Sequence, residues 1–207
     1  TASEGITLLQ NDGSLPLSKG TKISLFSHSS VDPIYTGTGS GSSSASKTTL
    51  KESIIDAGFT LNETLWDFYA SGNGSSYVRS SGSSGYGANE EWYINECPLS
   101  VLLNENGLSQ NWKDTTAVFV LSRTGGEGKD LPRSMRNWAN SEEDKSKHYL
   151  EPDSTELGVI SYLNDNFTNV ILIVNSNNAM ELGWVKNYPN VKSVLSAPAL
   201  GESGAGA

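Results

Sequence analysis

The strongest candidate for chemistry in this sequence is a carboxylate placed between glycines, directly after an apolar stretch. Residues 117–121 (AVFVL) are all apolar and two of them are β-branched, which predicts a buried strand. The chain then changes to glycine and charge in residues 122–132, where Glu127 lies between Gly126 and Gly128. Ligands of open α/β sheets bind beyond the carboxyl ends of the strands, on exposed loops. Glu127 is therefore the leading candidate for a catalytic residue. The alternative is that the glycines only form a tight turn, in which Glu127 is a solvated residue.

A second glycine-rich loop follows an earlier predicted strand. Residues 36–46 are mostly Gly, Ser and Thr, and a predicted helix comes directly after them. Strand, glycine-rich loop and helix also form the order of a mononucleotide-binding unit, so a phosphate or nucleotide binder is a rival interpretation. The alternating Gly37, Gly39 and Gly41 match neither Gly-x-Gly-x-x-Gly nor the Gly-Lys-Ser/Thr of a P-loop, which argues against that rival. Composition alone favours a flexible serine-rich loop here, with Ser40 at its centre.

Composition and charge exclude several classes of function. The 207 residues suit one domain, or one domain with a large insertion. A net charge of -9 argues against nucleic acid, because little in the sequence would neutralise phosphates. The apolar runs are far shorter than the roughly 20 residues of a membrane helix. A single cysteine, Cys97, excludes an internal disulfide and a thiolate metal cluster, and with only two histidines in the chain we expect a free or half-buried thiol. We expect no metal and no cofactor.

The remaining pattern alternates helices and strands, which implies a mainly parallel sheet covered on both faces. The predicted fold is therefore an α/β, three-layer αβα sandwich, and the chain stops early in what should be another helix. We expect the Asp153-Ser154 pair to cap the long helix that follows it. The predicted helices are 2–10, 50–57, 61–68, 154–163 and 179–185, and the predicted strands are 23–26, 117–121, 170–174 and 191–195.

Two polar regions interrupt this regular pattern. Residues 70–112 include a stretch composed almost entirely of Gly, Ser, Asn and Tyr, for which we expect a long loop or insertion. It carries the aromatic residues Tyr77, Tyr86, Trp92 and Tyr93, which could stack on sugar rings or simply pack the loop onto its own domain. Residues 141–147, between Trp138 and Tyr149, are predicted to be a solvated charged surface.

Several of these stretches together resemble the C-terminal α/β sandwich domain of glycoside hydrolase family 3, the β-glucosidase and β-xylosidase family. The matches follow the order of the family and cover most of the chain outside residues 70–112. They are the opening helix and turn, the glycine-serine substrate loop, the acid/base loop and a late glycine turn: residues 4–17 (EGITLLQNDGSLPL), 35–41 (YTGTGSG), 123–130 (RTGGEGKD) and 201–204 (GESG).

The resemblance implies a role for individual residues. Glu127 corresponds to the general acid/base of a retaining β-glycosidase that acts on β-glucosides, β-xylosides or related sugars. Ser40 corresponds to a substrate contact. We expect Arg123 and Asp130 to pair and shape the loop rather than take part in the chemistry. Retention needs two carboxyls about 5 to 5.5 Å apart. The family places the nucleophilic Asp on a separate barrel domain, and no stretch of this sequence resembles that motif.

We therefore expect residues 1–207 to be a segment of a longer chain, with the barrel as its partner and a carbohydrate as substrate. The competing interpretation is a non-catalytic carbohydrate-binding or interaction domain of the same fold. A flanking barrel with an Asp at a strand end would favour the hydrolase. The sugar, its linkage, the compartment and association into a homo-oligomer stay open at this point.

Overall fold

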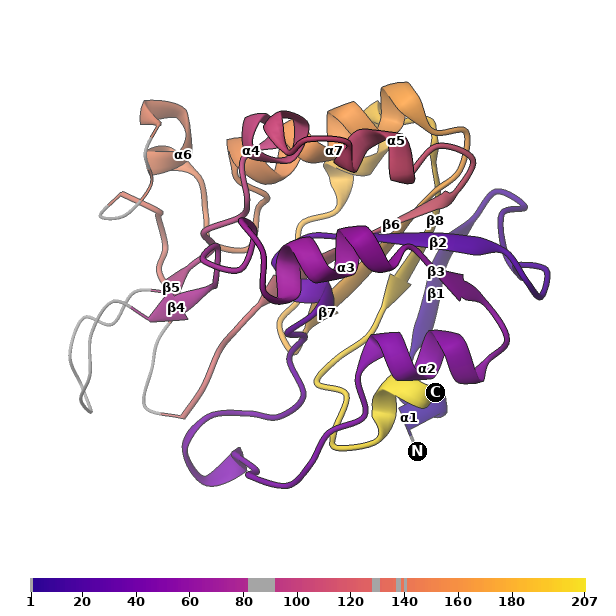
Figure 1. Ribbon diagram of the computed structural model, residues 1–207. Coiled ribbons are helices and arrows are strands. Elements are labelled where there is room, and N and C mark those ends of the chain that lie inside the picture. Colours follow the sequence, from indigo (N-terminus) through magenta and orange to yellow (C-terminus); the bar gives the residue numbers. More distant parts are fainter. Residues whose placement is uncertain (1, 82–91, 128–130, 137–138, 140) are drawn as a thin grey trace.

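The protein is built around one mainly parallel sheet (Figure 1). The computed structural model describes residues 2–81, 92–127, 131–136, 139 and 141–207. The six strands of the main sheet follow the order β1-β8-β7-β6-β2-β3, in which only the β1-β8 pair is antiparallel. Their bounds are β1 Thr7–Asn11, β2 Lys22–Phe26, β3 Thr60–Leu61, β6 Thr116–Arg123, β7 Val170–Ser176 and β8 Val191–Ser196.

Helices flank this sheet and confirm the predicted α/β sandwich. In Figure 1, α4, α5 and α7 lie together above the sheet, while α2 and the two chain ends lie below it. The α-helices are α1 Ala2–Gly5, α2 Leu50–Asp56, α3 Glu63–Ala70, α4 Leu99–Asn104, α5 Leu108–Asn111, α6 Glu142–Ser146 and α7 Ser154–Asn166, and the 3-10 helices are η1 His28–Ser30, η2 Gly39–Gly41, η3 Gly183–Asn187 and η4 Gly204–Gly206. No helix in the described residues is long and apolar enough to cross a membrane.

Side chains alternate between the two faces of the sheet, and each face has its own hydrophobic core. In β6, Phe119 and Leu121 pack with α3, α4, α5 and α7 on one face, whereas Val118 points to the other face. That second face is covered partly by α2, through Leu50 and Ile54. Because both faces are covered, the central strands are continuously apolar, which is why the sequence revealed them.

The predicted helix over residues 2–10 is wrong in its second half. Only Ala2–Gly5 is helical, and Thr7–Asn11 forms β1, an edge strand that pairs with β8. Helical spacing placed Leu9 on one face with Ala2 and Ile6, but Leu9 is 51% exposed, so this face is not a buried stripe. Tertiary pairing with β8 outweighs local periodicity here.

Helix caps agree with the sequence patterns. Asp153 caps α7 and Thr49 caps α2, and in both cases a glutamate three residues later completes a capping box. Gly58 follows α2 with a φ of 87°, the left-handed conformation expected of a glycine after a helix.

The two irregular regions contain more structure than the sequence indicated. Between residues 70 and 112, strands β4 (Ser80–Ser81) and β5 (Trp92–Tyr93) form an antiparallel pair, and α4 and α5 follow. In the stretch that we expected to be a solvated surface, Asp144 is buried. It accepts a 2.9 Å hydrogen bond from the Ser154 main-chain N–H, which ties α6 to the start of α7.

Parallel strands β2, β6 and β7 all end at one edge of the sheet. Paired positions such as Phe26 with Phe119, and Arg123 with Ser176, bring the exits of these strands side by side. The loops that leave these strands carry the residues that the sequence singled out, and we call this edge the carboxyl edge.

Candidate functional site

Glu127 lies on the loop that leaves β6 at the carboxyl edge. Its side chain is exposed. One carboxylate oxygen, Oε2, accepts a hydrogen bond of 2.8 Å from the main-chain N–H of Ser40. The structure thus brings together two predicted site residues that lie 87 positions apart in the sequence. Ser40 makes this contact through its backbone.

The loops that carry these residues fit closely. A Cβ atom added to Gly126 would lie 1.6 Å from Oγ1 of Thr38, and one added to Gly39 would lie 2.6 Å from Oε2 of Glu127. A side chain at Gly126 would require Thr38 to move, and one at Gly39 would require the Glu127 carboxylate or the loop to move. The glycines are therefore needed for close approach, in addition to any role in turn formation.

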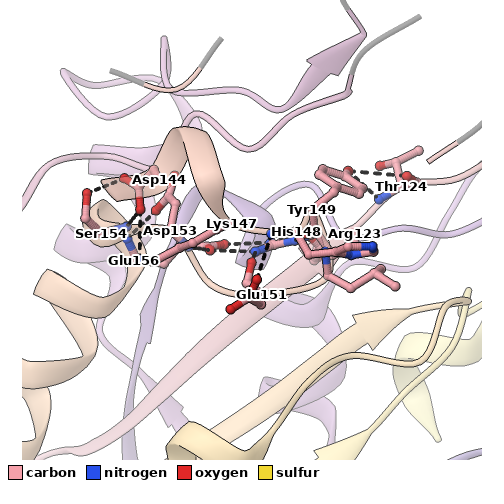
Figure 2. A network of polar contacts seen from close by, with 12 residues as sticks. Arg123, Thr124, Asp144, Lys147, His148, Tyr149, Glu151, Asp153, Ser154 and Glu156 are labelled. Carbon is pink, nitrogen blue, oxygen red and sulfur yellow. Dashed lines mark hydrogen bonds and ion pairs between the residues drawn. The ribbon is translucent and has the colours of Figure 1, made fainter. Parts of the chain in front are cut away.

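Arg123, at the end of β6, is completely buried and forms an ion pair with Glu156 (Figure 2). Two hydrogen bonds join the groups, Nη1 to Oε1 at 2.8 Å and Nη2 to Oε2 at 2.7 Å. The remaining donors go to main-chain carbonyls of Ser122, Tyr149 and Glu151. All five guanidinium donors are thereby satisfied.

In the described residues the ionic partner of Arg123 is Glu156. Asp130 lies outside the described residues, so the expected pairing of Arg123 with Asp130 stays a prediction. Burial alone would lower the pKa of Arg123, but the charge of Glu156 and its hydrogen bonds raise it. Arg123 therefore stays charged, and its hydrogen bonds to the carbonyls of Tyr149 and Glu151 shape the 149–151 turn.

Tyr149 connects this buried network to the loop of Glu127. Its hydroxyl accepts from the main-chain N–H of Thr124 at 3.2 Å and donates to the carbonyl of the same residue at 3.3 Å (Figure 2). Arg79 adds a hydrogen bond from Nε to Oγ1 of Thr124, at 3.2 Å. Thr124, three residues before Glu127, is therefore held on its N–H, its carbonyl and its side chain.

Asn175 organises the same edge, and sequence reasoning missed it because it follows the predicted strand 170–174. It is 1% exposed and lies inside β7. Its Oδ1 accepts from Ile34 N–H at 2.5 Å and from the Ser122 hydroxyl at 3.2 Å. Its Nδ2 donates to carbonyls beyond β2 and β8, those of Ile34, Ala197 and Pro198. One amide side chain thus joins the exits of four strands.

Buried carboxyls surround the Arg123 pair. Burial, aided by the nearby charge of Glu156, raises the pKa of Asp153 to about 7. Glu96 is 8% exposed, and burial raises its pKa to about 8, against 4.5 for an ordinary glutamate. The Cys97 main-chain N–H donates to Glu96 Oε1 at 2.8 Å. A pKa near neutrality is a property of acid/base residues, so Glu96 is a second candidate that the sequence gave no signal for.

Glu96 and Asp153 line a pocket of about 590 Å³ that lies between residues 77–78, β5 and the start of α7. Tyr77 and Tyr93 also line it, both half-buried, whereas Tyr86, Trp138 and the side chain of Trp92 lie outside the described residues. These carboxyls stabilise the fold in this position. Asp153 caps α7, since its side chain accepts a 2.8 Å hydrogen bond from Glu156 N–H. This satisfied arrangement favours a structural role, and Glu127 stays the better catalytic candidate.

The single thiol is inert in this fold. Cys97 is fully buried and free, and burial, followed by the charge of Glu96, raises its pKa to about 12. A thiol of that kind is a poor nucleophile. Across the ranges that the structure describes, no three His, Cys, Asp or Glu side chains gather to hold a metal ion.

Comparison with known sequences gives the family of this chain. The sequence model named "Glycosyl hydrolase family 3 C-terminal domain" matches residues 6–207. A β-glucosidase of Ruminococcus albus is 29% identical over 191 residues, which is 90% of this chain and 18% of that protein. β-Glucosidase A of Butyrivibrio fibrisolvens is 24% identical over 220 residues, 95% of this chain and 24% of that protein.

Solved structures share the fold. A β-glucosidase from Paenibacillus barengoltzii superposes with a TM-score of 0.75 at 19% identity, over 99% of this chain and 21% of its own. β-Glucosidase 3B from Thermotoga neapolitana, solved with α-D-glucose, gives 0.70 at 24% identity, over 99% of this chain and 27% of its own. The chain thus spans roughly a fifth to a quarter of each of these larger enzymes. It belongs to glycosyl hydrolase family 3, and corresponds to the C-terminal domain of that family.

Proposed function

We propose that this chain supplies the general acid/base, Glu127, of a retaining β-glycosidase. The observation that carries the proposal is the position of Glu127: an exposed carboxyl at the carboxyl edge of the sheet, with one oxygen held by the Ser40 N–H. Loops at this edge are the usual ligand site of open α/β sheets. The relatives named β-glucosidases support a β-glucoside, β-xyloside or related sugar as substrate.

The chemistry needs a second carboxyl, which we place on a barrel domain of the same protein. In the first step the barrel Asp attacks the anomeric carbon while Glu127 gives its proton to the glycosidic oxygen, so that the C–O bond breaks and the alcohol leaves. In the second step Glu127 takes a proton from water, and the water oxygen displaces the Asp from the anomeric carbon. Both steps invert, so the product keeps the β configuration.

Ser40 is proposed to border the same site. Ser40 is exposed, and its main-chain N–H donates a hydrogen bond to Glu127. Its hydroxyl is the part of the residue that we assign to substrate. Arg123 lies too deep to meet a sugar and acts on the loop only through the Tyr149 region.

The test is a comparison of leaving groups in the full-length protein. Replacing Glu127 by Gln should slow hydrolysis of alkyl glucosides and cellobiose by roughly 10² to 10⁴, the usual contribution of a positioned proton donor. Cleavage of dinitrophenyl glucoside, whose leaving group needs little protonation, should fall much less in the glycosylation step. Equal losses on all substrates would contradict the assignment. It would also be contradicted if Glu96→Gln showed this dependence on the leaving group while Glu127→Gln kept wild-type rates.

The alternative function is a non-catalytic carbohydrate-binding or interaction domain of the same fold. It predicts that Glu127→Gln leaves turnover by the full-length protein unchanged on every glycoside, while binding of sugar to residues 1–207 persists. Calorimetric titration of that segment with glucose and cellobiose distinguishes the two.

A further inference from the structure

The loops that carry Gly39 and Glu127 are in close contact, and the contact is made by the side chain of Glu127. A Cβ added at Gly39 would meet Oε2 of Glu127 at 2.6 Å, its Cβ at 3.0 Å and its Cδ at 3.4 Å. The space that a side chain would need at Gly39 is thus filled by the side chain of Glu127 itself. A methyl group there could be accommodated only by moving the carboxylate or the whole loop.

The backbone of Gly39 also aims the hydrogen bond that Glu127 receives. Its φ is 62°, in the left-handed region, and it begins the short helix η2. This conformation presents the N–H of the next residue, Ser40, to Oε2 of Glu127 at 2.8 Å. One residue therefore provides both the space and the direction for the carboxylate.

We propose that Gly39 is a positioning residue for Glu127: the absence of its side chain and its left-handed backbone fix where the proton-donating carboxylate lies. The inference rests on the proposed role of Glu127. A general acid must lie within hydrogen-bond reach of the leaving oxygen. A displacement of about 1 Å can reduce such catalysis about 10²-fold.

The partner loop shows the same complementarity from the other side. Thr38 enters the space at Gly126, where an added Cβ would lie 1.6 Å from Oγ1 and 2.9 Å from Cβ. The two loops therefore fit closely at both glycines. Of the two, Gly39 is the one at which an added Cβ would meet the carboxylate of Glu127.

Asparagine at position 39 separates the two roles of the glycine. Asn tolerates the left-handed region better than other residues with a side chain, so Gly39→Asn keeps the turn but places a Cβ against Glu127. Two matched controls are available. Gly20→Asn tests the left-handed backbone alone, because Gly20 has a φ of 81° and open space around its Cβ position, while Gly41→Ala adds a methyl to the same helix η2 in open space.

The test uses the full-length enzyme and a series from dinitrophenyl glucoside to alkyl glucoside. We expect Gly39→Asn to lose about 10²-fold in kcat/KM on the poorest leaving groups and little on the most activated, with both controls close to wild type throughout. Gly39→Ala, which adds less bulk but more backbone strain, should show the same pattern if it folds.

Two results would overturn the inference: a Gly39→Asn enzyme that matches wild type on poor leaving groups, or one that loses the same factor on every substrate. Glu127→Gln in the same series keeps this failure separate from failure of the proposed function. If Glu127→Gln depends on the leaving group and Gly39→Asn does not, only the positioning role is wrong. If Glu127→Gln itself shows no such dependence, the acid/base assignment is wrong.

Discussion

The buried carboxyl of Glu96 should make the stability of this domain fall as pH rises. In the folded protein its pKa is about 8, against 4.5 for an ordinary glutamate, with burial as the main cause. Between these two values the folded state holds a proton that the unfolded state has lost. The stability that the Glu96 carboxyl contributes is therefore complete below the lower pKa and is lost progressively as pH rises to the higher pKa. Above the higher pKa it no longer changes with pH.

The magnitude follows from the same two values. They differ by about 3.5 pH units, and each unit corresponds to about 1.4 kcal/mol, which sets an upper limit of about 5 kcal/mol. Glu96→Gln keeps an oxygen to accept from Cys97 N–H, at 2.8 Å in the wild type, but has no proton to lose. Its free energy of unfolding should depend less on pH, by up to that amount. Asp153, with a pKa of about 7, leaves a residual slope of the same sign.

Urea unfolding of the wild-type chain and the Glu96→Gln variant between about pH 5 and about pH 9 measures the difference. Glu181→Gln, at an exposed glutamate, controls for removal of one negative charge. If wild type and Glu96→Gln lose the same free energy over this range, Glu96 is ionised in the folded protein and the reasoning fails.

Three further predictions test the network and the division of labour between domains. Residues 1–207 alone should fold but release no nitrophenol from aryl glucosides or xylosides, and measurable release by the purified segment would contradict a nucleophile on another domain. Tyr149→Phe removes the hydroxyl that bonds Thr124 twice and should reduce the free energy of unfolding by about 1–3 kcal/mol. A change below the error of urea unfolding would show that these hydrogen bonds are dispensable. Glu156→Gln leaves the Arg123 guanidinium buried without its counter-charge and should cost about 3–5 kcal/mol by the same measurement, whereas a loss under about 1 kcal/mol would mean that water reaches the pair.

The sequence predicts the central strands well because both faces of the sheet are covered. Residues 117–121 and 170–174 are continuous apolar runs, and they lie within β6 and β7. The edge strand β1 was mistaken for helix because its burial is slight and because Leu9 lies at helical spacing from Ala2 and Ile6, which precede the strand. What makes it a strand is pairing with β8, which local sequence does not record.

The candidate site likewise contains residues that the sequence identified and residues that it did not. The glycine-rich loop after an apolar strand identified Glu127 as a candidate, the family resemblance identified Ser40, and the fold brings the two loops into contact. Asn175 could not be predicted, because its 2.5 Å bond to Ile34 spans 141 positions of sequence. The same holds for the partner of Arg123, since Glu156 lies on α7, 33 positions away. Contacts between distant loops depend on packing that the pattern of residue types does not specify.

The assignment of Glu127 as the acid/base is tested most directly by chemical rescue in the full-length enzyme. With Glu127→Ala and dinitrophenyl glucoside, the first step should proceed and the covalent intermediate should accumulate, because no base activates water. Azide needs no base to attack, so its addition should restore turnover and yield a glucosyl azide of β configuration, identified by NMR. If azide restores no turnover and forms no β-glucosyl azide, Glu127 is a structural residue and the proton donor lies elsewhere.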